Sequence, residues 1–360
     1  MRYGLLISLV FMVTSAQAVE YSPLPASGAI GKYEKAEVPF EIDKLKALWK
    51  KRIAAIQDSG TLPIIDIESS FNAGKMDARD YARSMDENGI ALTAFSAQVG
   101  KKKYKKAGML WEDAARRAVA ADPSRYVPAS TAGIYPAFTK EPDAFVESTI
   151  KHVKKDHYPL MGEFEFRHYM SPRQYKNNET DRDVAIPINS PAAQKLFAFS
   201  ARSGISFQIH YEIEDKLLPP LETMLTKYPQ AKVIWCHLAQ IRYARRAKNY
   251  TPEYVRKLIE TYPNLYFDLA FGNSASVYPG SNEKHARVWD GGSRVKQAWI
   301  DLITAHPYRF LAALDIGGDR MDEVGENTRT LRKFIANLPK ETQAIVAYKA
   351  AWKLLFNEQL

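Results

Sequence analysis

The sequence predicts an α/β fold, specifically a (β/α)8 barrel of the TIM type with an extra N-terminal helix and additional C-terminal helices. Two observations predict it: apolar, β-rich segments recur along the chain, and helical patterns separate them. The segments are 62–67, 90–95, 126–134, 160–166, 205–209, 231–236, 265–270 and 309–314. Strands that alternate with helices form a parallel sheet, and eight of them are enough to close a barrel.

The helices carry their own boundary signals. Ser190 and Thr251 each precede a proline, which is the typical pairing of an N-cap residue with the first helical position. Gly204 stands just before a strand, where a helix commonly ends. Apolar residues at helical spacing within 42–56 predict the extra helix before the first strand. Segments 328–336 and 341–356 predict two helices after the last strand.

The first eighteen residues have the pattern of a secretory signal. Arg2 precedes the apolar run 4–13, and the small residues Ala16 and Ala18 end the segment. A membrane anchor is the alternative, but the run is about half of the roughly 20 residues that span a bilayer. We expect residues 1–18 to be a signal peptide, 19–58 an N-terminal extension with its helix, and 59–360 the barrel. The mature protein is then periplasmic or secreted.

Composition restricts the partners and the sources of stability. The single cysteine, Cys236, cannot form an intramolecular disulfide, so a hydrophobic core must stabilise the chain. The formal net charge is +9, which favours anionic partners. The basic run 101–106 follows the second strand and either attracts an acidic substrate or surface or is a solvated loop. No nucleic-acid motif is present, and no later segment is apolar for long enough to span a membrane. The sequence leaves the oligomeric state open.

Polar residues end four of the predicted strands. They are Glu68, His210, His237 and Asp315. A lone histidine there is often only hydrogen-bonded, and a lone aspartate is often the N-cap of the next helix. A closed barrel, however, brings its strand ends around one mouth, where the active sites of this architecture lie. Together the four residues predict a polar site.

Ordered segments of the chain then resemble a known family. They are Pro63-Ile64-Ile65-Asp66, Asp122-Pro123-Ser124-Arg125-Tyr126-Val127, Gly162-Glu163, Ile209-His210, Trp235-Cys236-His237 and Arg309-Phe310-Leu311-Ala312-Ala313-Leu314-Asp315. This series, across residues 60–357, resembles the strand signatures of the amidohydrolase-related (amidohydrolase 2) family. That family belongs to the metal-dependent TIM-barrel hydrolase superfamily and contains hydrolases, lactonases and nonoxidative decarboxylases.

The resemblance implies a divalent metal and a set of site residues. The matching metal positions are Glu68, His210 and Asp315, with zinc as the first expectation and manganese as the second. His237 and Asp315 match acid/base positions beside the metal. The sequence departs from the family at Ser70, which stands where a second histidine usually binds the metal. Serine is a poor zinc ligand.

Charged residues near the mouth are candidates for binding a small-molecule substrate. Glu163 and Glu165 alternate on the fourth strand and should share one face, followed by Arg167, which could bind a substrate carboxylate or form an internal ion pair. Arg320 follows the eighth strand as a second anion-binding candidate, and its neighbour Asp319 is an alternative to Asp315 as metal ligand. Glu163, Arg167 and Arg320 are the predicted substrate-binding residues.

These observations predict an exported metal-dependent hydrolase that acts on a small carboxylate, ester, lactone or amide substrate through metal-activated water. Two alternatives stay open. The serine at position 70 favours a catalytically silent barrel that binds a ligand. Glu68 in place of the usual first histidine resembles some nonoxidative decarboxylases of the family.

Overall fold

The computed structural model describes residues 19–34, 38–318 and 320–360. The predicted signal peptide, residues 1–18, and the alternative ligand Asp319 therefore lie outside the described residues. Within the described ranges, no helix combines the length and the apolar character needed to cross a membrane.

Parallel strands form the centre of the molecule, and each predicted segment overlaps one of them. The eighth strand is in two pieces. The strands are β1 (Ile64–Phe71), β2 (Ile90–Ala97), β3 (Tyr126–Pro128), β4 (Leu160–His168), β6 (Ser206–Tyr211), β7 (Val233–Trp235), β8 (Leu265–Asp268), β13 (Phe310–Leu311) and β14 (Ile316–Gly318).

Backbone hydrogen bonds close the strands into a ring. One set runs β14-β1-β2-β3 and the other β13-β8-β7-β6-β4. The eighth strand joins them, because β13 pairs with β8 and β14 with β1, and Ile67 N donates to Ala312 O over 3.1 Å. On the other side a parallel bridge between Ala129 and Leu160 joins the end of β3 to β4. The predicted (β/α)8 barrel is confirmed.

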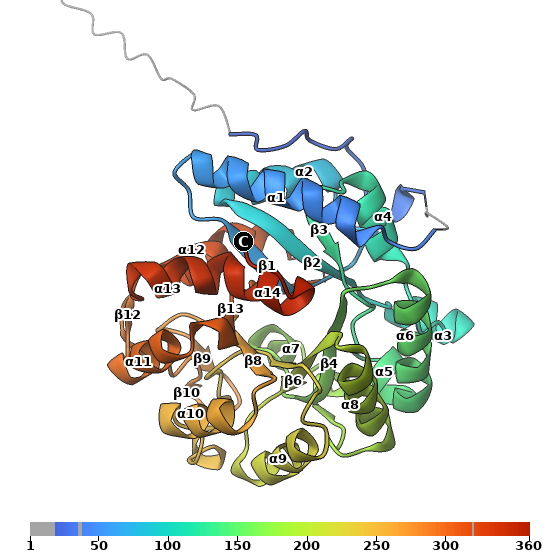
Figure 1. Cartoon of the computed structure of the whole chain (residues 1–360). Coiled ribbons are helices and arrows are strands. Elements are labelled where there is room, and N and C mark those ends of the chain that lie inside the picture. The colour runs from blue at the N-terminus through green and yellow to red at the C-terminus, as the bar shows by residue number, and fades with distance from the viewer. Residues whose placement is uncertain (1–18, 35–37, 319) are drawn as a thin grey trace, which may run out of the picture.

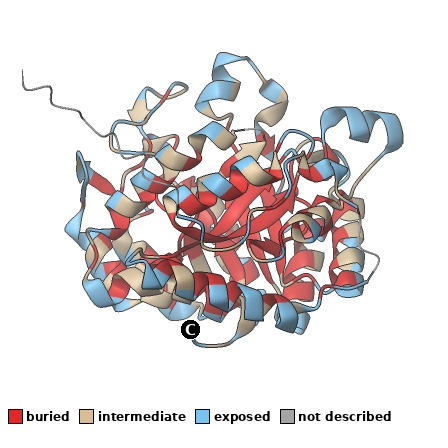
Figure 2. Cartoon of the chain, turned by 90° about the horizontal axis from the view of Figure 1, so that it is seen from above, coloured by how far each residue is buried: buried red, intermediate tan, exposed pale blue. Residues whose placement is uncertain are grey.

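Helices surround the strands, with buried faces inward and exposed faces outward (Figure 2). Their boundary signals are those that the sequence predicts: Ser190 Oγ accepts from Ala193 N, Thr251 Oγ1 accepts from Tyr254 N, and Gly204 ends its helix at φ 72°. The surrounding helices are α2 (Ala78–Asn88), α4 (Ala114–Ala121), α6 (Pro142–Asp156), α8 (Pro191–Ser203), α9 (Leu218–Lys227), α10 (Pro252–Thr261), α11 (Gln297–Ala305) and α12 (Val324–Ile335).

Helices from the two ends of the chain pack together against the barrel (Figure 1). The first is α1 (Ile42–Asp58), and the last are α13 (Lys340–Ala344) and α14 (Ala350–Phe356), joined by a π-helical turn over Ile345–Lys349. Trp49 of α1 stacks on Phe356 of α14 with ring centroids 5.6 Å apart.

Short elements that follow the strands surround the mouth, and the sequence analysis did not predict them. They are α3 (Lys101–Ala107), α5 (Ala137–Lys140), α7 (Pro172–Lys176), β5 (Val184–Ala185) and two hairpins, β9 (Val277–Tyr278) with β10 (Glu283–Lys284) and β11 (Trp289–Gly291) with β12 (Arg294–Val295). The basic run 101–106 thus begins a helix, and Lys101 from that helix lines the cavity described below.

A buried ionic network ties the N-terminal segment to the barrel. Asp86 accepts from Arg52 over 2.6 Å and from Arg125 over 2.8 Å, and all three side chains are almost fully buried. Arg125 also donates to the carbonyl oxygens of Ser22 and Pro23, at 3.1 and 3.0 Å. The segment before α1 is therefore bound to the barrel by buried charge-assisted hydrogen bonds.

Candidate metal centre

A cavity of about 650 Å³ lies at the end of the barrel where the strands terminate. Glu163, His210, Asp315 and Arg320 line it, as the sequence analysis expected of residues around one mouth. Glu68 and His237, which were expected there too, do not line the cavity, but His237 contacts both Glu163 and His210. The volume lies within the range of small-molecule sites.

Three potential ligand atoms converge beside this cavity. Glu163 Oε1 lies 2.8 Å from His210 Nδ1 and 3.1 Å from His237 Nε2, and the two nitrogens lie 3.0 Å apart. Glu163 belongs to β4 and His210 to β6, whereas His237 lies two residues after the end of β7. All three are buried. One glutamate and two histidines in such proximity form a typical donor set for a divalent metal.

The outer nitrogen of each histidine is already used. His237 Nδ1 lies 2.9 Å from Ala270 O, and because a carbonyl oxygen only accepts, Nδ1 carries the hydrogen. His210 Nε2 lies 3.2 Å from Glu212 Oε1, which accepts in the same way when ionised. In each neutral ring the inner nitrogen, His210 Nδ1 or His237 Nε2, then carries a lone pair and no hydrogen. Two lone pairs and a carboxylate oxygen repel one another unless a proton or a metal cation lies among them.

The charges in the cluster agree with that conclusion. Burial alone would lower the pKa of His210, but the Glu163 and Glu212 carboxylates raise it to about 10. Burial alone would likewise lower the pKa of His237, but the hydrogen bond that its ring makes to the Glu163 carboxylate raises it to about 9. Burial would raise the pKa of Glu163, yet the two histidines hold it well below its usual range. Without a metal, the cluster therefore retains a proton.

A second group of potential ligands adjoins the first and shares His237. Glu68, His237 and Asp268 offer atoms that lie within 4.8 Å of one another. Glu68 Oε2 and Asp268 Oδ2 are buried without a hydrogen-bond partner among the described residues. Burial and then the charge of Glu163 raise the pKa of Glu68 well above its usual value. Buried unpartnered carboxylate oxygens need a counter-charge, so the residues present fit a bound divalent metal.

Asp315, predicted as both ligand and catalytic residue, is in neither group of ligand atoms. Its side chain is 44% exposed, and its Oδ1 lies 3.4 Å from Arg320 Nη2. Its backbone nitrogen donates to Glu68 O over 3.0 Å, which places Asp315 next to the second group. Of the three predicted metal ligands, the structure brings Glu68 and His210 to His237 and leaves Asp315 at the cavity wall.

The other residues singled out in the sequence are variously placed. Ser70 lines the cavity, and its hydroxyl accepts from the Gln98 side chain over 2.9 Å. Arg167 does not line the cavity. Its guanidinium donates to Asp183 over 2.5 Å and lies 3.4 Å from Glu214, which corresponds to the internal ion pair that the sequence analysis left open. Arg320 does line it and pairs with Glu323 over 2.7 Å.

Two site residues have backbone conformations that residues other than glycine rarely adopt. His237 has φ 62° and Asp315 has φ 49°, both in the left-handed region. A non-glycine residue there costs on the order of 1 kcal/mol and persists only where its surroundings hold it. His237 N is held by Asp268 Oδ1 at 2.9 Å and Asp315 N by Glu68 O at 3.0 Å. The conformation sets the direction of the His237 side chain just after β7 and that of the Asp315 side chain in the break between β13 and β14.

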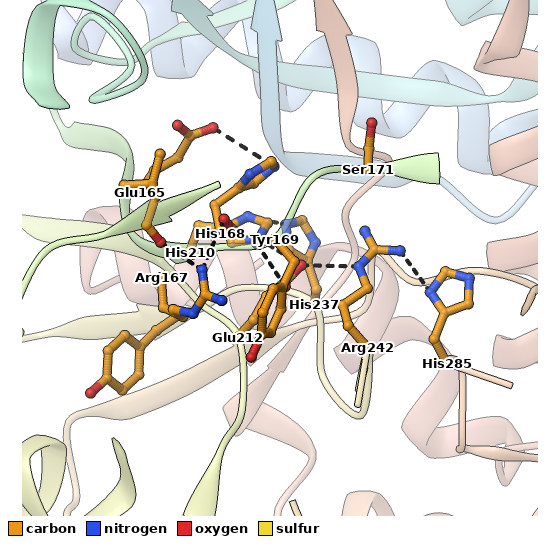
Figure 3. Close-up of polar contacts among 12 residues, drawn as sticks. Glu165, Arg167, His168, Tyr169, Ser171, His210, Glu212, His237, Arg242 and His285 are labelled. Atoms are coloured by element: carbon orange, nitrogen blue, oxygen red, sulfur yellow. Dashed lines mark hydrogen bonds and ion pairs between the residues drawn. The ribbon is translucent and has the colours of Figure 1, made fainter. Parts of the chain in front are cut away.

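Sequence reasoning missed Asp268, Glu212, Arg242 and His285. Asp268 ends the apolar run of β8, so the strand-end argument could have found it. Figure 3 shows Glu212 next to His210 and His237, with Arg242 beyond it and His285 at the far side of Arg242. Glu212 Oε1 accepts from Arg242 Nε over 3.1 Å, and Arg242 Nη1 donates to His285 Nδ1 over 2.8 Å. Arg242 and His285 lie in loops without periodicity, which carry no such signal.

No protein-family model and no curated protein sequence matches the chain. Among solved structures, the chain is similar to a 2,6-dihydroxybenzoate decarboxylase complexed with 2,6-dihydroxybenzoate, at 12% identity and a TM-score of 0.49, over 82% of this chain and 99% of that one. A dihydroxybenzoic acid decarboxylase from Polaromonas sp. JS666 with bound manganese and 2-nitroresorcinol gives 13% identity and a TM-score of 0.48, over 82% of this chain and 98% of that one.

An amidohydrolase from Burkholderia multivorans with bound zinc gives 10% identity and a TM-score of 0.46, over 81% of this chain and 98% of that one. Amidohydrolases and decarboxylases are the kinds of protein that the resemblance in the sequence implied. The barrel itself is established by the hydrogen bonds between its strands.

Proposed function

We propose that this protein is an exported metal-dependent hydrolase that acts on a small carboxylate, ester, lactone or amide substrate. The observation that carries the proposal is the convergence of His210 Nδ1, His237 Nε2 and Glu163 Oε1 within 2.8 to 3.1 Å, with the outer nitrogen of each ring already used. Two imidazole nitrogens and a carboxylate suit zinc, and additional carboxylates also suit manganese.

The ligand residues have distinct roles in this proposal. Glu163, His210 and His237 hold the metal, while Glu68 and Asp268 supply the nearby negative charge. The partners of the outer nitrogens orient the two rings, as outer hydrogen bonds commonly do in metal sites. When bound there, a divalent metal supplies a Lewis acid that lowers the pKa of water and polarises a carbonyl group.

Asp315 is the proposed acid/base residue. It lines the cavity, is half exposed and lies next to Glu68, so its carboxylate can reach both bulk water and a substrate. Arg320 Nη2 donates to Asp315 O over 2.8 Å and fixes this segment. In the proposed reaction Asp315 accepts a proton from the attacking water and returns it to the leaving group.

Elemental analysis of the mature protein, purified without chelator, tests the metal. We expect near-stoichiometric zinc or manganese in the wild type and little in Glu163→Gln, His210→Ala and His237→Ala. The matched control is Glu165→Gln, because Glu165 lies two residues along the same strand and lines the same cavity but pairs with Arg182. A wild type that stays metal-free after incubation with both ions would contradict the proposal and favour the silent barrel.

Hydrolysis of an ester, lactone and amide panel tests the activity. We expect Asp315→Asn to keep the metal and lose about a hundredfold or more of the rate, which is typical for removal of an acid/base group. A rate that does not follow metal content across the variants would exclude metal-dependent hydrolysis. N-terminal sequencing of the exported protein tests the proposed signal peptide, for which the expected first residue is Val19.

A further inference from the structure

We infer that Arg242 and His285 form a subsite for a carboxylate group, so that the substrate carries a carboxylate remote from the bond that is broken. That the bound molecule is a substrate rests on the proposed function, whereas the subsite itself follows from contacts in the structure. Both side chains line the cavity, and both are more than nine-tenths buried. Neither residue was identified from the sequence.

The Arg242 guanidinium is fixed on three sides. Its Nε donates to Glu212 Oε1 over 3.1 Å, its Nη1 donates to His285 Nδ1 over 2.8 Å, and its Cζ lies 5.1 Å from the ring centroid of Tyr278. In Figure 3 the arginine lies between Glu212 and His285, with the end of its guanidinium directed toward Ser171, another cavity residue. A side chain held in this way loses little entropy when it binds a ligand.

Two donors of this pair remain free. Arg242 Nη2 has no hydrogen bond to a described residue. His285 Nδ1 must accept from arginine, which has no lone pair to offer, so a neutral His285 carries its hydrogen on Nε2. Burial and the Arg242 charge lower the pKa of His285 to about 4, which keeps the ring neutral near pH 7. No described residue accepts from Nε2, which is therefore a second donor at the cavity.

The charges around Arg242 favour a ligand group with one negative charge over a group with two. Glu212 already pairs with Arg242, so the guanidinium can neutralise one further negative charge only in part. The cavity lining contains six acidic and five basic side chains: Glu163, Glu165, Glu179, Asp315, Glu323 and Glu326 against Lys101, Arg173, Arg182, Arg242 and Arg320. A doubly charged phosphate would meet more repulsion here than a singly charged carboxylate, whose oxygens can accept from the two free donors, Arg242 Nη2 and His285 Nε2.

The subsite lies beside the candidate metal centre without belonging to it. Glu212 Oε1 accepts from Arg242 on one side and faces His210 Nε2, at 3.2 Å, on the other. A carboxylate on Arg242 is thus separated from the ligand atoms by Glu212 and the His210 ring. A substrate that spans both would be held at its carboxylate while its ester, lactone or amide bond is presented to the metal centre.

Calorimetric titration of the full mature protein with benzoate, benzamide and phenylphosphonate tests the subsite. We expect benzoate to bind more tightly than its neutral isostere benzamide and more tightly than phenylphosphonate. Arg242→Met and Arg242→Lys should each weaken benzoate about tenfold to a hundredfold, as expected for a charge-assisted pair, and leave benzamide unchanged. Arg242→Lys keeps a positive charge beside Glu212 and serves if Arg242→Met does not fold.

The matched control is Arg246→Met. Arg246 lies on the same loop, but it is exposed, does not line the cavity and donates to Tyr169 Oη over 3.0 Å. This variant should bind benzoate like the wild type. Equal benzoate affinity in the wild type and both Arg242 variants would overturn the subsite, as would no saturable benzoate binding up to about 10 mM. Tighter binding of phenylphosphonate would overturn the assignment to a carboxylate.

Repetition on chelator-treated protein separates this inference from the proposed function. If benzoate binding depends on Arg242 and survives metal removal, the subsite stands even if elemental analysis finds no native metal. If benzoate binding disappears with the metal in every variant, benzoate binds the metal alone. That result would overturn the subsite while supporting the metal centre.

Discussion

His210 Nδ1 and His237 Nε2 face each other at 3.0 Å, and each ring uses its other nitrogen for an outer hydrogen bond. Two neutral imidazoles cannot satisfy each other in this arrangement, because neither inner nitrogen has a hydrogen to donate. Glu163 Oε1, which contacts both nitrogens, adds a third acceptor. This arrangement of three acceptors needs a cation among them, and in the proposed metal centre a proton and a metal would compete for that position.

This competition predicts that metal affinity rises with pH. The pKa of His210 is raised to about 10 and that of His237 to about 9, so near pH 7 a proton occupies the cluster and must leave when metal binds. We expect the apparent affinity for zinc to increase about tenfold per pH unit for each proton displaced, between pH 6 and 8. Competition titrations with a chromogenic chelator measure it. An affinity that does not change with pH would contradict the shared proton.

Asp66 should make the folded state less stable as the pH rises. Burial, only partly offset by hydrogen bonds from Ser69, Leu314 and Glu68, raises its pKa to about 7. The pKa in the unfolded chain is lower, so the stabilisation is complete below about pH 4 and is lost as the pH rises through about 7, roughly 4 kcal/mol in all.

Urea denaturation of the wild type and Asp66→Asn across this pH range measures the effect. The asparagine can accept the same backbone hydrogen bonds without ionising, so the variant should lose less stability on going from pH 4 to pH 8. Asp80→Asn, at an exposed helical position, is the control and should follow the wild type. Parallel profiles for the wild type and Asp66→Asn would rule out Asp66 as the source.

Gly162 should not tolerate a side chain. A Cβ atom there would lie 2.1 Å from Ser96 Oγ and 2.8 Å from Ser130 O, and the second atom is backbone that cannot move away cheaply. We expect Gly162→Ala to reduce the free energy of unfolding by at least about 2 kcal/mol through overpacking. Gly100→Ala, whose Cβ would meet nothing within 4 Å, should change it by less than about 0.5 kcal/mol. Similar melting temperatures for the two variants would show that β4 can shift.

Arg125 should contribute strongly to stability through the buried network. Arg125→Met would leave Asp86 with one arginine fewer and would free the carbonyl oxygens of Ser22 and Pro23. Loss of one partner of a buried ion pair typically costs about 3 to 5 kcal/mol. We also expect faster proteolysis within the N-terminal segment. Arg83→Met, which removes an exposed ion pair, should cost less than about 1 kcal/mol.

Much of the fold could be predicted, because buried parallel strands are continuous apolar runs and helix caps have residue signatures. Ser190, Thr251 and Gly204 are examples of such caps. The short elements around the mouth could not, because two-residue strands and a helix such as Lys101–Ala107 carry no periodicity. The π-helical turn within 341–356 could not be predicted either, because its apolar residues continue the spacing of the neighbouring α-helices.

The location of the site was predictable, but its ligand geometry was not. Of the four residues that the strand-end argument named, His210 and Asp315 line the cavity, whereas Glu68 and His237 do not line it but offer atoms to the adjoining groups of potential ligands. Strand ends alone could not indicate that Asp315, at φ 49°, would lie outside both groups of ligand atoms. The sequence could not show that Arg167 pairs with Asp183, because the two residues meet only where the chain reverses and forms β5. Glu163, predicted to bind substrate, does line the cavity, and the sequence could not show that it also contacts both histidines.

The pairing of the eighth strand with the first has a consequence for biosynthesis. Leu314 N donates to Asp66 Oδ1 across 248 positions of sequence, and Asp315 N donates to Glu68 O at the same seam. During translation Glu68 is made early but stays without these neighbours until the eighth strand docks. A nascent or truncated chain can therefore bury its first strands and still lack the wall that completes the mouth. Asp315 and the cavity wall to which it belongs would then reach their final place only at the end of folding.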